Sequence, residues 1–406
     1  MPIVRAALVA SAVVLSAICA VAAGSAQTAD GQIVPSTLES PAKTDSAQPQ
    51  LTVSKRGVLL SWIERTGPEA TLKFSERTAD GWTAPTVVAA GRDWFVNWAD
   101  VPSVVRLEDG TVVAHWLQKS GPDTYAYDVR LSHSRDGGKT WSSPIKPHSD
   151  GTKTEHGFAT LFQMPGAGLG LVWLDGRDQE LNTTDPLGGS MALYYASFDS
   201  SWKQTAESVV NARVCECCQT AAVLTADGVV TAFRDRSADE IRDIKVSRLD
   251  AGKWTPELAL HDDNWKIDAC PINGPALSAR GRQVAAAWFA APNDNGRAFV
   301  AFSQDAGKTW GQAVRLDDEA SLGRVDIEML DDGSAIASWI EFAGGKSQFK
   351  VRHITSSGQK SAAVDVPGAG RVSGYPRMTR AGNELILAWT EGESGQQVKA
   401  AVARLK

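Results

Sequence analysis

The sequence has almost no long apolar run and no large excess of either charge. A membrane span needs about 20 consecutive apolar residues, and the one run of that kind lies at the N-terminus, from Ile3 to Ala23. Lys and Arg total 41 against 47 Asp and Glu, so the net charge is −6. This balance argues against a nucleic-acid partner, because such proteins usually carry a basic face. A sustained 3.6-residue apolar period is also lacking, so the fold is not expected to be helical.

The N-terminus has the three-part layout of an export signal. Residues 1–5 carry one positive charge, residues 6–23 are small and apolar, and Gly24-Ser25-Ala26 offers a small-x-small cleavage site. A membrane anchor is the alternative, but the apolar core is short for one. A lipoprotein modified at Cys19 is disfavoured because the bulky Ile18 precedes it.

These features predict the organisation of the whole chain. Residues 1–26 are expected to be a signal peptide, 27–50 a polar N-terminal segment, and 51–406 the folded domain. The mature protein would then be secreted or periplasmic, with no membrane span after signal removal.

The rest of the chain is a repeat marked by one aromatic residue after each short apolar run. The gaps between these aromatics are 50 to 60 residues. A turn, usually Asp-Gly or Gly, precedes each run, and Asp-Gly between alternating runs is a strong hairpin signal. The pattern of each unit therefore predicts four antiparallel strands. The seven aromatics are Trp62, Trp116, Trp173, Phe233, Trp288, Trp339 and Trp389.

Seven units with this spacing match the blades of a β-propeller. The predicted fold class is all-β, a propeller of four-stranded antiparallel blades, with seven blades preferred and six as the alternative. Separate β-sandwiches are disfavoured because the period is even and no linker interrupts it. The last unit stops after its third strand, and the segment Gln32–Thr37 could supply the fourth and close the ring.

Two turns carry the motif Ser-x-Asp-x-Gly-x-Thr-Trp, at residues 134–141 and 303–310. This is the Asp-box, and two intact copies at equivalent positions are specific. The chain therefore resembles the sialidase (neuraminidase) superfamily of Asp-box, or BNR-repeat, β-propellers. The resemblance implies six blades and hydrolysis of terminal sialic acids, so the unit at residues 51–98 would be an additional blade. The motif itself is structural, because its Asp can accept backbone N–H groups and its Gly permits a positive φ.

The resemblance also implies a set of catalytic residues. Sialidases bind the substrate carboxylate with three Arg, and use a Tyr–Glu pair as nucleophile and an Asp as acid/base. Where the family has Arg-Ile-Pro-Ser, this chain has Asp-Val-Pro-Ser, so Asp100 replaces the first Arg. The resemblance places Arg234 at the second Arg and Tyr375 near the nucleophile, and Asp100 or Asp235 would be the acid/base.

Other members of that set are missing or displaced. Gln219 stands at the family's Glu position, with Glu216 three residues away, and the third Arg has no counterpart. A single Arg binds a carboxylate much less firmly than three Arg, which together provide several bidentate hydrogen bonds. Asp100 would also repel the carboxylate. Weak or absent sialidase activity is therefore expected.

Propeller geometry predicts that one mouth of the channel collects reactive residues. The first strand of each unit lines the channel, so the residues where these strands begin converge. Charged loops follow the second strands of the third and fourth units, and a cleft with titratable groups is the default site. The residues that converge are Asp100, His156, Cys218, Cys270, Arg324 and Tyr375. His156, Arg324 and the loop residues Arg177 and Arg236 are expected, with Arg234, to bind substrate.

Four cysteines remain after the signal: Cys215, Cys217, Cys218 and Cys270. In an exported protein, disulfides that brace the mouth are favoured, with Cys218–Cys270 the natural bridge between neighbouring units. The alternative is a copper or zinc site formed by the four thiolates with His156 nearby.

Three functions stay open from the sequence. The first is an exported sialidase-like hydrolase, an exo-glycosidase acting on a terminal sugar at the channel mouth. The second is a non-catalytic propeller that binds a glycan or a protein at the same mouth. The third is a metal- or redox-linked propeller that uses the cysteines.

Overall fold

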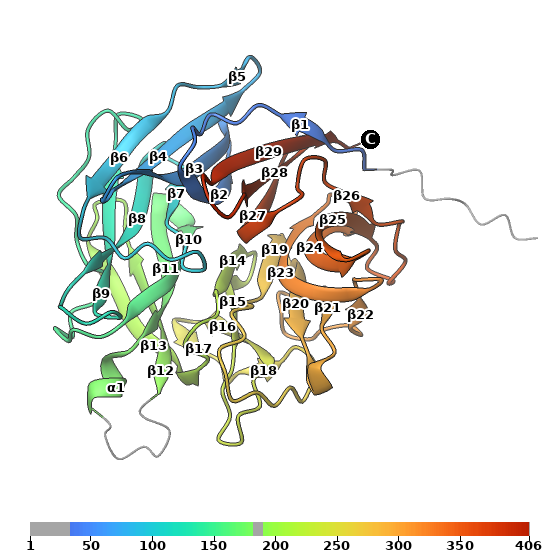
Figure 1. Cartoon of the computed structure of the whole chain (residues 1–406). Helices are drawn as coiled ribbons and strands as arrows, with labels where there is room; N and C mark the ends of the chain where they lie inside the picture. The colour runs from blue at the N-terminus through green and yellow to red at the C-terminus, as the bar shows by residue number, and fades with distance from the viewer. Residues whose placement is uncertain (1–32, 182–189, 406) are drawn as a thin grey trace, which may run out of the picture.

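The computed structural model describes residues 33–181 and 190–405, and nearly all of its regular structure is β-strand. Seven antiparallel sheets stand around a central channel (Figure 1). The predicted seven-bladed propeller is confirmed, and the six-bladed alternative is wrong. The predicted signal peptide, residues 1–26, lies outside the described residues.

The blades follow the chain in order. Blade 1 contains β2 (Ser46–Ser54), β3 (Gly57–Thr66), β4 (Glu69–Thr78), β5 (Gly81–Trp82) and β6 (Thr86–Gly91). Blade 2 contains β7 (Ser103–Arg106), β8 (Val112–Lys119) and β9 (Tyr127–Ser134). Blade 3 contains β10 (His156–Met164), β11 (Gly168–Asp175), β12 (Met191–Phe198) and β13 (Gln204–Val214). Blade 4 contains β14 (Ala221–Thr225), β15 (Gly228–Arg234), β16 (Ile244–Asp250), β17 (Lys253–Trp254) and β18 (Leu258–Ala259).

The remaining blades are more regular. Blade 5 contains β19 (Ala276–Arg280), β20 (Gln283–Ala290), β21 (Arg297–Ser303) and β22 (Val314–Arg315). Blade 6 contains β23 (Ala320–Met329), β24 (Ala335–Ala343), β25 (Lys346–Ile354) and β26 (Val364–Asp365). Blade 7 contains β27 (Val372–Ala381), β28 (Glu384–Glu391), β29 (Gln397–Arg404) and the N-terminal strand β1 (Ser36–Leu38).

Helical structure is scarce. The described helices are α1 (Arg177–Leu181) and two 3₁₀ turns, Pro165–Ala167 and Pro292–Asp294. None of the described helices is long and apolar enough to cross a membrane.

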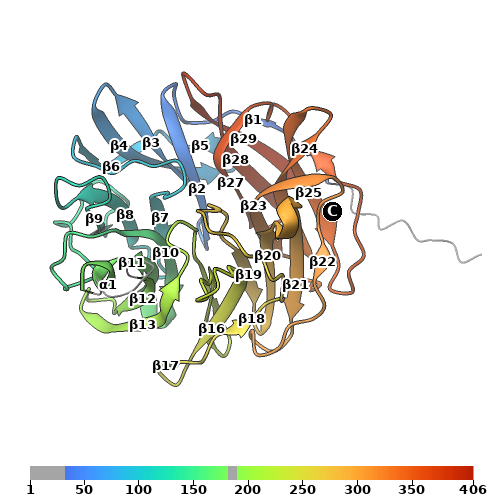
Figure 2. The ribbon, with the colours of Figure 1, turned by 60° about the horizontal axis from the view of Figure 1, so that its bottom comes forward.

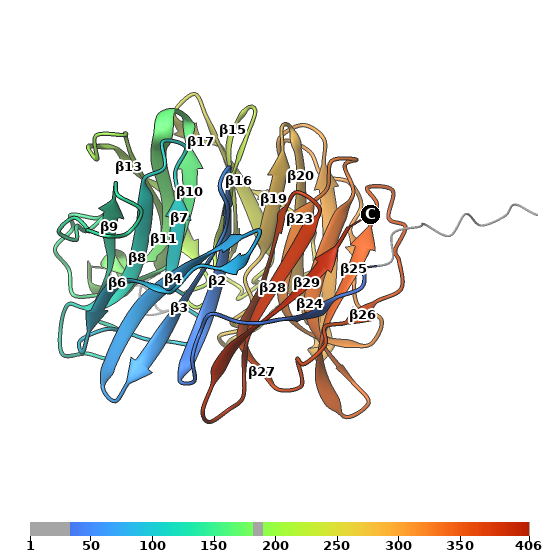
Figure 3. The same ribbon diagram turned by 90° about the horizontal axis from the view of Figure 1, so that it is seen from above.

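In each blade the first strand is the innermost one. Strands β2, β7, β10, β14, β19, β23 and β27 surround the channel (Figures 1 and 2). The loops that connect the strands lie at the two ends of the ring (Figure 3). The beginnings of the innermost strands therefore meet at one mouth, as the repeat pattern predicts.

The repeated aromatic residue fills the space between neighbouring sheets. All seven, at the second-strand positions named above, are at most 4% exposed. Trp62 packs against Ile386 of blade 7, and Trp173 packs against Leu131 of blade 2. Each aromatic thus contacts the blade before its own, and burying so large a side chain contributes about 2–3 kcal/mol.

The Asp-box turns are structural in this protein. Asp136 accepts the backbone N–H of Thr140 at 2.9 Å, and Ser134 Oγ accepts the N–H of Gly138 at 2.8 Å. Gly138 has φ 96°, which only glycine adopts readily. The copy at 303–310 repeats these contacts. These hydrogen bonds lower the pKa of Asp136 to about 2, so its carboxylate stays charged and holds the turn.

The N-terminal strand completes the last blade. β1 pairs antiparallel with β29, with Ser36 opposite Val402 and Leu38 opposite Ala400. Nearby, Ile33 is 4% exposed and packs among core residues of blades 6 and 7. The N-terminal segment therefore supplies both an edge strand and a buried side chain to the end of the ring.

Replacing Ile33 with Ala should destabilise the protein by about 2–4 kcal/mol, because it leaves a cavity between the last two blades. Its neighbour Val34 is 64% exposed, so Val34→Ala should change the unfolding free energy by less than about 0.5 kcal/mol. Urea denaturation of both variants measures the difference. Equal stabilities would show that the segment before β1 does not hold the ring closed.

Candidate functional site

A cavity of about 330 Å³ opens where the innermost strands of blades 2 to 5 begin. We call it the mouth pocket. Five aromatic residues and five polar or reactive side chains line it. The aromatic residues are Phe95, Trp98, Tyr125, Tyr127 and Phe158, and the polar or reactive ones are Asn97, Glu155, Glu216, Cys217 and Cys270.

The aromatic residues of the pocket are stacked, and two of them are exposed. Phe95 stacks on Tyr127 with ring centroids 4.0 Å apart and an interplanar angle of 9°. Tyr125 lies beside Phe95 at 6.1 Å and is 59% exposed, and Trp98 is 43% exposed. Large apolar rings gathered at a pocket and left open to solvent mark a binding surface.

Two carboxyl groups share one hydroxyl at the base of this pocket. Tyr127 Oη lies 2.6 Å from Glu155 Oε1 and 3.3 Å from Asp100 Oδ2. Burial raises the pKa of Asp100 to about 7 and the pKa of Glu155 to about 7. A tyrosine hydroxyl has a single proton to donate. The three groups are therefore most stable when at least one carboxyl is protonated.

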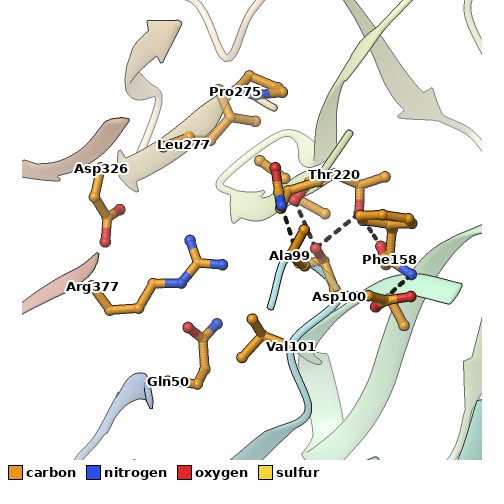
Figure 4. A pocket seen from close by; sticks show the side chains of 16 residues that line it. Gln50, Ala99, Asp100, Val101, Phe158, Thr220, Pro275, Leu277, Asp326 and Arg377 are labelled. Carbon is orange, nitrogen blue, oxygen red and sulfur yellow. Dashed lines mark hydrogen bonds between the residues drawn. The ribbon is translucent and has the colours of Figure 1, made fainter. Parts of the chain in front are cut away.

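Asp100 separates the mouth pocket from the channel. It is 1% exposed, and its Oδ1 accepts the backbone N–H of Phe158 at 2.8 Å. On its other side lies a channel cavity of about 130 Å³, where Asp326 and Arg377 stand across from it (Figure 4). Asp100 is thus a buried support for Tyr127, whereas the half-buried Glu155 is the acid that faces the pocket.

Tyr375 and Arg324 lie beneath Trp98. The Tyr375 side chain is 3% exposed, and its hydroxyl donates to the carbonyl of Ile272. Trp98 stacks over its ring at 6.1 Å, and the Arg324 guanidinium lies 5.0 Å from the Trp98 ring. Burial raises the pKa of Tyr375 well above its ordinary value. Neither residue lines the mouth pocket.

Arg234 is directed into the protein. It is 1% exposed and donates to the carbonyls of Arg242, Asn273 and Phe289 at 2.6 to 3.0 Å. Its guanidinium also lies 4.8 Å from the Trp265 ring. The carboxylate contact expected from the resemblance would need an exposed guanidinium, and Arg234 instead fixes the loops of blades 4 and 5.

The charged loop of blade 4 forms ion pairs around Glu216. Arg236 Nη1 lies 3.3 Å and Arg242 Nη1 3.2 Å from the Glu216 carboxylate. Asp235 pairs with Lys245 at 3.3 Å and does not line the mouth pocket. Glu216 is therefore an ion-paired carboxylate that faces the same cavity as Glu155.

Behind the pocket lies a buried network of His and Asp side chains. The rings of His148 and His156 stack at 3.8 Å. His156 Nε2 is 3.3 Å from Asp150 and 3.6 Å from Asp175. Burial alone would lower the pKa of His156, but its hydrogen bond to Asp150 and the nearby carboxylates raise it. With Asp128, these residues could also hold a cation.

Arg177 belongs to this network. It pairs with Asp175 at 2.7 Å and with Glu207 at 3.1 Å, and its guanidinium lies 3.9 Å from the Tyr194 ring. His156 and Arg177 are thus brought together, but away from the mouth pocket.

The cysteines gather at the rim of the pocket as free thiols. Cys215 Sγ lies 3.3 Å from Cys218 Sγ and 3.7 Å from Cys217 Sγ. Cys270 is exposed and lines the pocket together with Cys217. Hydrogen bonds from the Cys217 and Cys218 thiols hold the pKa of Cys215 well below its ordinary value. Cys215, Cys217 and Cys218 are another group that could hold a metal.

The residues where the innermost strands were expected to begin do not include Glu155, Tyr127 or Trp98. His156 is the first residue of β10, and Glu155 just before it faces the opposite side, since successive strand residues alternate. The residues on either side of each expected strand start are therefore also candidates, and they include Glu155. Trp98 lies in an irregular loop and has no periodic signal.

Residues 66–387 match the BNR repeat-like domain family, which is most of the chain. The chain belongs to this family. The resemblance to sialidase-type Asp-box propellers is thereby confirmed at the level of the fold and the repeat.

Solved structures similar to this BNR propeller include carbohydrate-active enzymes. The polysaccharide lyase Uly1 is 10% identical, with a TM-score of 0.56, over 89% of this chain and 90% of that one. A PL25 ulvan lyase bound to a GlcA(1-4)Rha3S saccharide is 8% identical, with a TM-score of 0.56, over 91% and 96%. The K499G mutant of NanB sialidase from Streptococcus pneumoniae is 9% identical, with a TM-score of 0.48, over 93% and 96%. No curated protein matches the chain in sequence.

The raised pKa of Asp100 has a testable consequence for stability. A carboxyl whose pKa is higher in the folded state stabilises the protein at low pH, and this contribution is lost as the pH rises from about 4 to about 7. Asp100→Asn keeps the shape but cannot ionise. Its unfolding free energy relative to the unmodified protein should therefore rise by about 2 kcal/mol between pH 5 and pH 8. Parallel pH profiles in chemical denaturation would contradict the assignment.

Proposed function

We propose that this BNR propeller is an exported glycoside hydrolase that binds an uncharged sugar in the mouth pocket, with Glu155 as the proton donor. The observation that carries the proposal is that Glu155, hydrogen-bonded to Tyr127, lines the same pocket as the exposed rings of Trp98 and Tyr125. The N-terminal pattern of the sequence supports export to the periplasm or the exterior.

The aromatic residues of the pocket support a saccharide ligand. The flat C–H faces of a sugar can pack on exposed rings, and Trp98 and Tyr125 offer such faces on the rim. Hydroxyl groups of the sugar could bond to Asn97, Glu155 and Glu216, which line the same cavity. A pocket that is mostly apolar with a few polar groups is the usual form of a small-molecule site.

The acid chemistry follows from two carboxyl groups in different surroundings. A general acid works best with a pKa near the working pH, and the pKa of Glu155 is about 7 because the group is buried. Tyr127 donates to it at 2.6 Å and fixes its orientation. Glu216, paired with two Arg, supplies a negative charge that can stabilise the positive character of a glycosidic transition state.

The charge of the pocket supports a neutral sugar over an acidic one. Among the described residues that line it are two Glu and neither Arg nor Lys. A sialic acid or uronate carboxylate would find no guanidinium or ammonium group to pair with among these lining residues. The lyases with similar folds act on polysaccharides, and this supports a carbohydrate ligand for the present chain only in general terms.

A non-catalytic glycan-binding propeller is the second candidate. The burial of Arg234 and Tyr375 favours it, because the residues expected for sialidase-type catalysis do not reach the pocket. It differs from the first proposal in that Glu155 would contribute to binding only.

We expect Glu155→Gln to lower turnover of a neutral 4-nitrophenyl glycoside by about 10²–10⁴-fold while binding changes little, because only proton donation is lost. Trp98→Ala should weaken binding about tenfold. Glu69→Gln, at an exposed residue outside the pocket lining, is the matched control and should change neither.

The assay uses a panel of neutral glycosides and one fluorogenic sialoside, with hydrolysis and calorimetric binding measured separately. Robust turnover of the sialoside would contradict the proposed preference for uncharged sugars. Binding without turnover, equal in Glu155→Gln, would select the non-catalytic propeller. Absence of both binding and turnover across the panel would overturn both candidates.

A further inference from the structure

We propose that Cys215, Cys217, Cys218 and Cys270 form a site for one thiophilic d¹⁰ cation, Cu(I) or Zn(II), at the rim of the mouth pocket. The proposal stands on the arrangement of the thiols and does not depend on saccharide hydrolysis.

The chain places three sulfur atoms together within one turn. Cys215 follows β13 directly, and its N–H donates to the carbonyl of Arg234 at 2.9 Å. This bond pins the beginning of the turn, and β14 begins only at Ala221. The sulfur atoms of Cys215, Cys217 and Cys218 all lie within 4.8 Å of one another.

The sulfur–sulfur distances fit a shared ion better than a covalent bond. Cys215 Sγ lies 3.3 Å from Cys218 Sγ and 3.7 Å from Cys217 Sγ, and both distances are far longer than the about 2.05 Å of a disulfide. Four sulfurs at about 2.3 Å from zinc would lie about 3.8 Å from one another. The thiols of Cys215, Cys217 and Cys218 therefore need only a small movement to surround an ion.

Positive charge is already present beside these thiols. Arg242 Nη1 lies 3.4 Å from Cys215 Sγ, and only 2% of its side chain is exposed. Cys215 and Cys218 are themselves 1% and 2% exposed. Several thiolates around one cation leave a net negative charge, and a buried guanidinium can offset it.

Cys270 supplies a fourth ligand from the next blade. It lies in the loop before β19, and its side chain interacts with that of Cys217. Both residues line the mouth pocket. An ion held by all four would link blades 4 and 5, and would stand at the edge of the proposed sugar site. Soft thiolate ligands select Cu(I) or Zn(II) over the hard cations Mg²⁺ and Ca²⁺.

Binding is an exchange of protons for a metal ion, with no redox step. Each ligating thiol releases its proton, and the sulfur lone pair forms the bond to the ion. Disulfide formation is the competing fate, since two bonds among these four thiols would consume all the ligands and would require an oxidant.

The test uses the folded protein purified without oxygen, with Cys19→Ser as the background so that only these four thiols are counted. Zn(II) and Cu(I) are titrated separately against a chromophoric chelator, and Co(II) serves as a spectroscopic probe. We expect about one ion per chain, a nanomolar or tighter affinity for at least one of the two d¹⁰ ions, and intense thiolate-to-Co(II) charge-transfer bands.

Variants assign the ligands. Cys217→Ser should weaken binding at least 100-fold, and Cys270→Ser about tenfold with a weaker charge-transfer band. His261→Ala is the control for adventitious binding at an exposed His, and should still take up one ion. If Cys217→Ser does not fold, the Co(II) spectrum of the unmodified protein decides by itself.

Reduced, folded protein that binds no ion, or binds only at micromolar affinity, would overturn the proposal. So would thiols that stay oxidised in two disulfides under conditions where the protein is folded and reductant is present. Sugar binding is measured on the metal-free protein, so failure of one proposal is distinguishable from failure of the other.

Discussion

The packing of one aromatic side chain against the preceding blade is the interaction on which the whole ring depends. A blade is a small sheet with two apolar faces and cannot bury both alone. The second-strand aromatics, from Trp62 to Trp389, fill the gaps between sheets, and blade 1 closes the circle through Trp62 against blade 7. Because this contact repeats in every blade, the seven sheets stand around one channel with their first strands innermost.

The mouth of the channel has two chemically distinct sides because adjacent residues of a strand point in opposite directions. Tyr127 and Glu155 face the mouth pocket, whereas their neighbours Asp128 and His156 join the buried His–Asp network. The network carries several charges in a largely buried region. The ion pairs of this network fix the backbone next to Tyr127 and Glu155. A rigid polar network therefore supports the aromatic and acidic side chains that a ligand would contact.

The sequence predicts the ring better than the site. Aromatic spacing identifies seven blades because each blade repeats the same packing, and the Asp-box turns repeat the same hydrogen bonds. The site depends on single contacts that carry no period. The Arg234 guanidinium is bound by the carbonyls of Arg242, Asn273 and Phe289, and Trp98 covers Tyr375. Both arrangements depend on the conformation of loops that carry no repeat. The proximity of Cys215, Cys217 and Cys218 can be predicted from the sequence, because the three residues lie within four consecutive positions.

The pairing of β1 with β29 has a consequence for the order of folding. Ser36 and Val402 are 366 positions apart in the chain, yet they lie side by side and Ser36 Oγ donates to the Val402 carbonyl. Contacts between such distant residues form slowly because a long loop must close first. During synthesis β1 has no partner until β29 has been made. Six blades can assemble as the chain grows, and the circle is locked only by the meeting of its two ends.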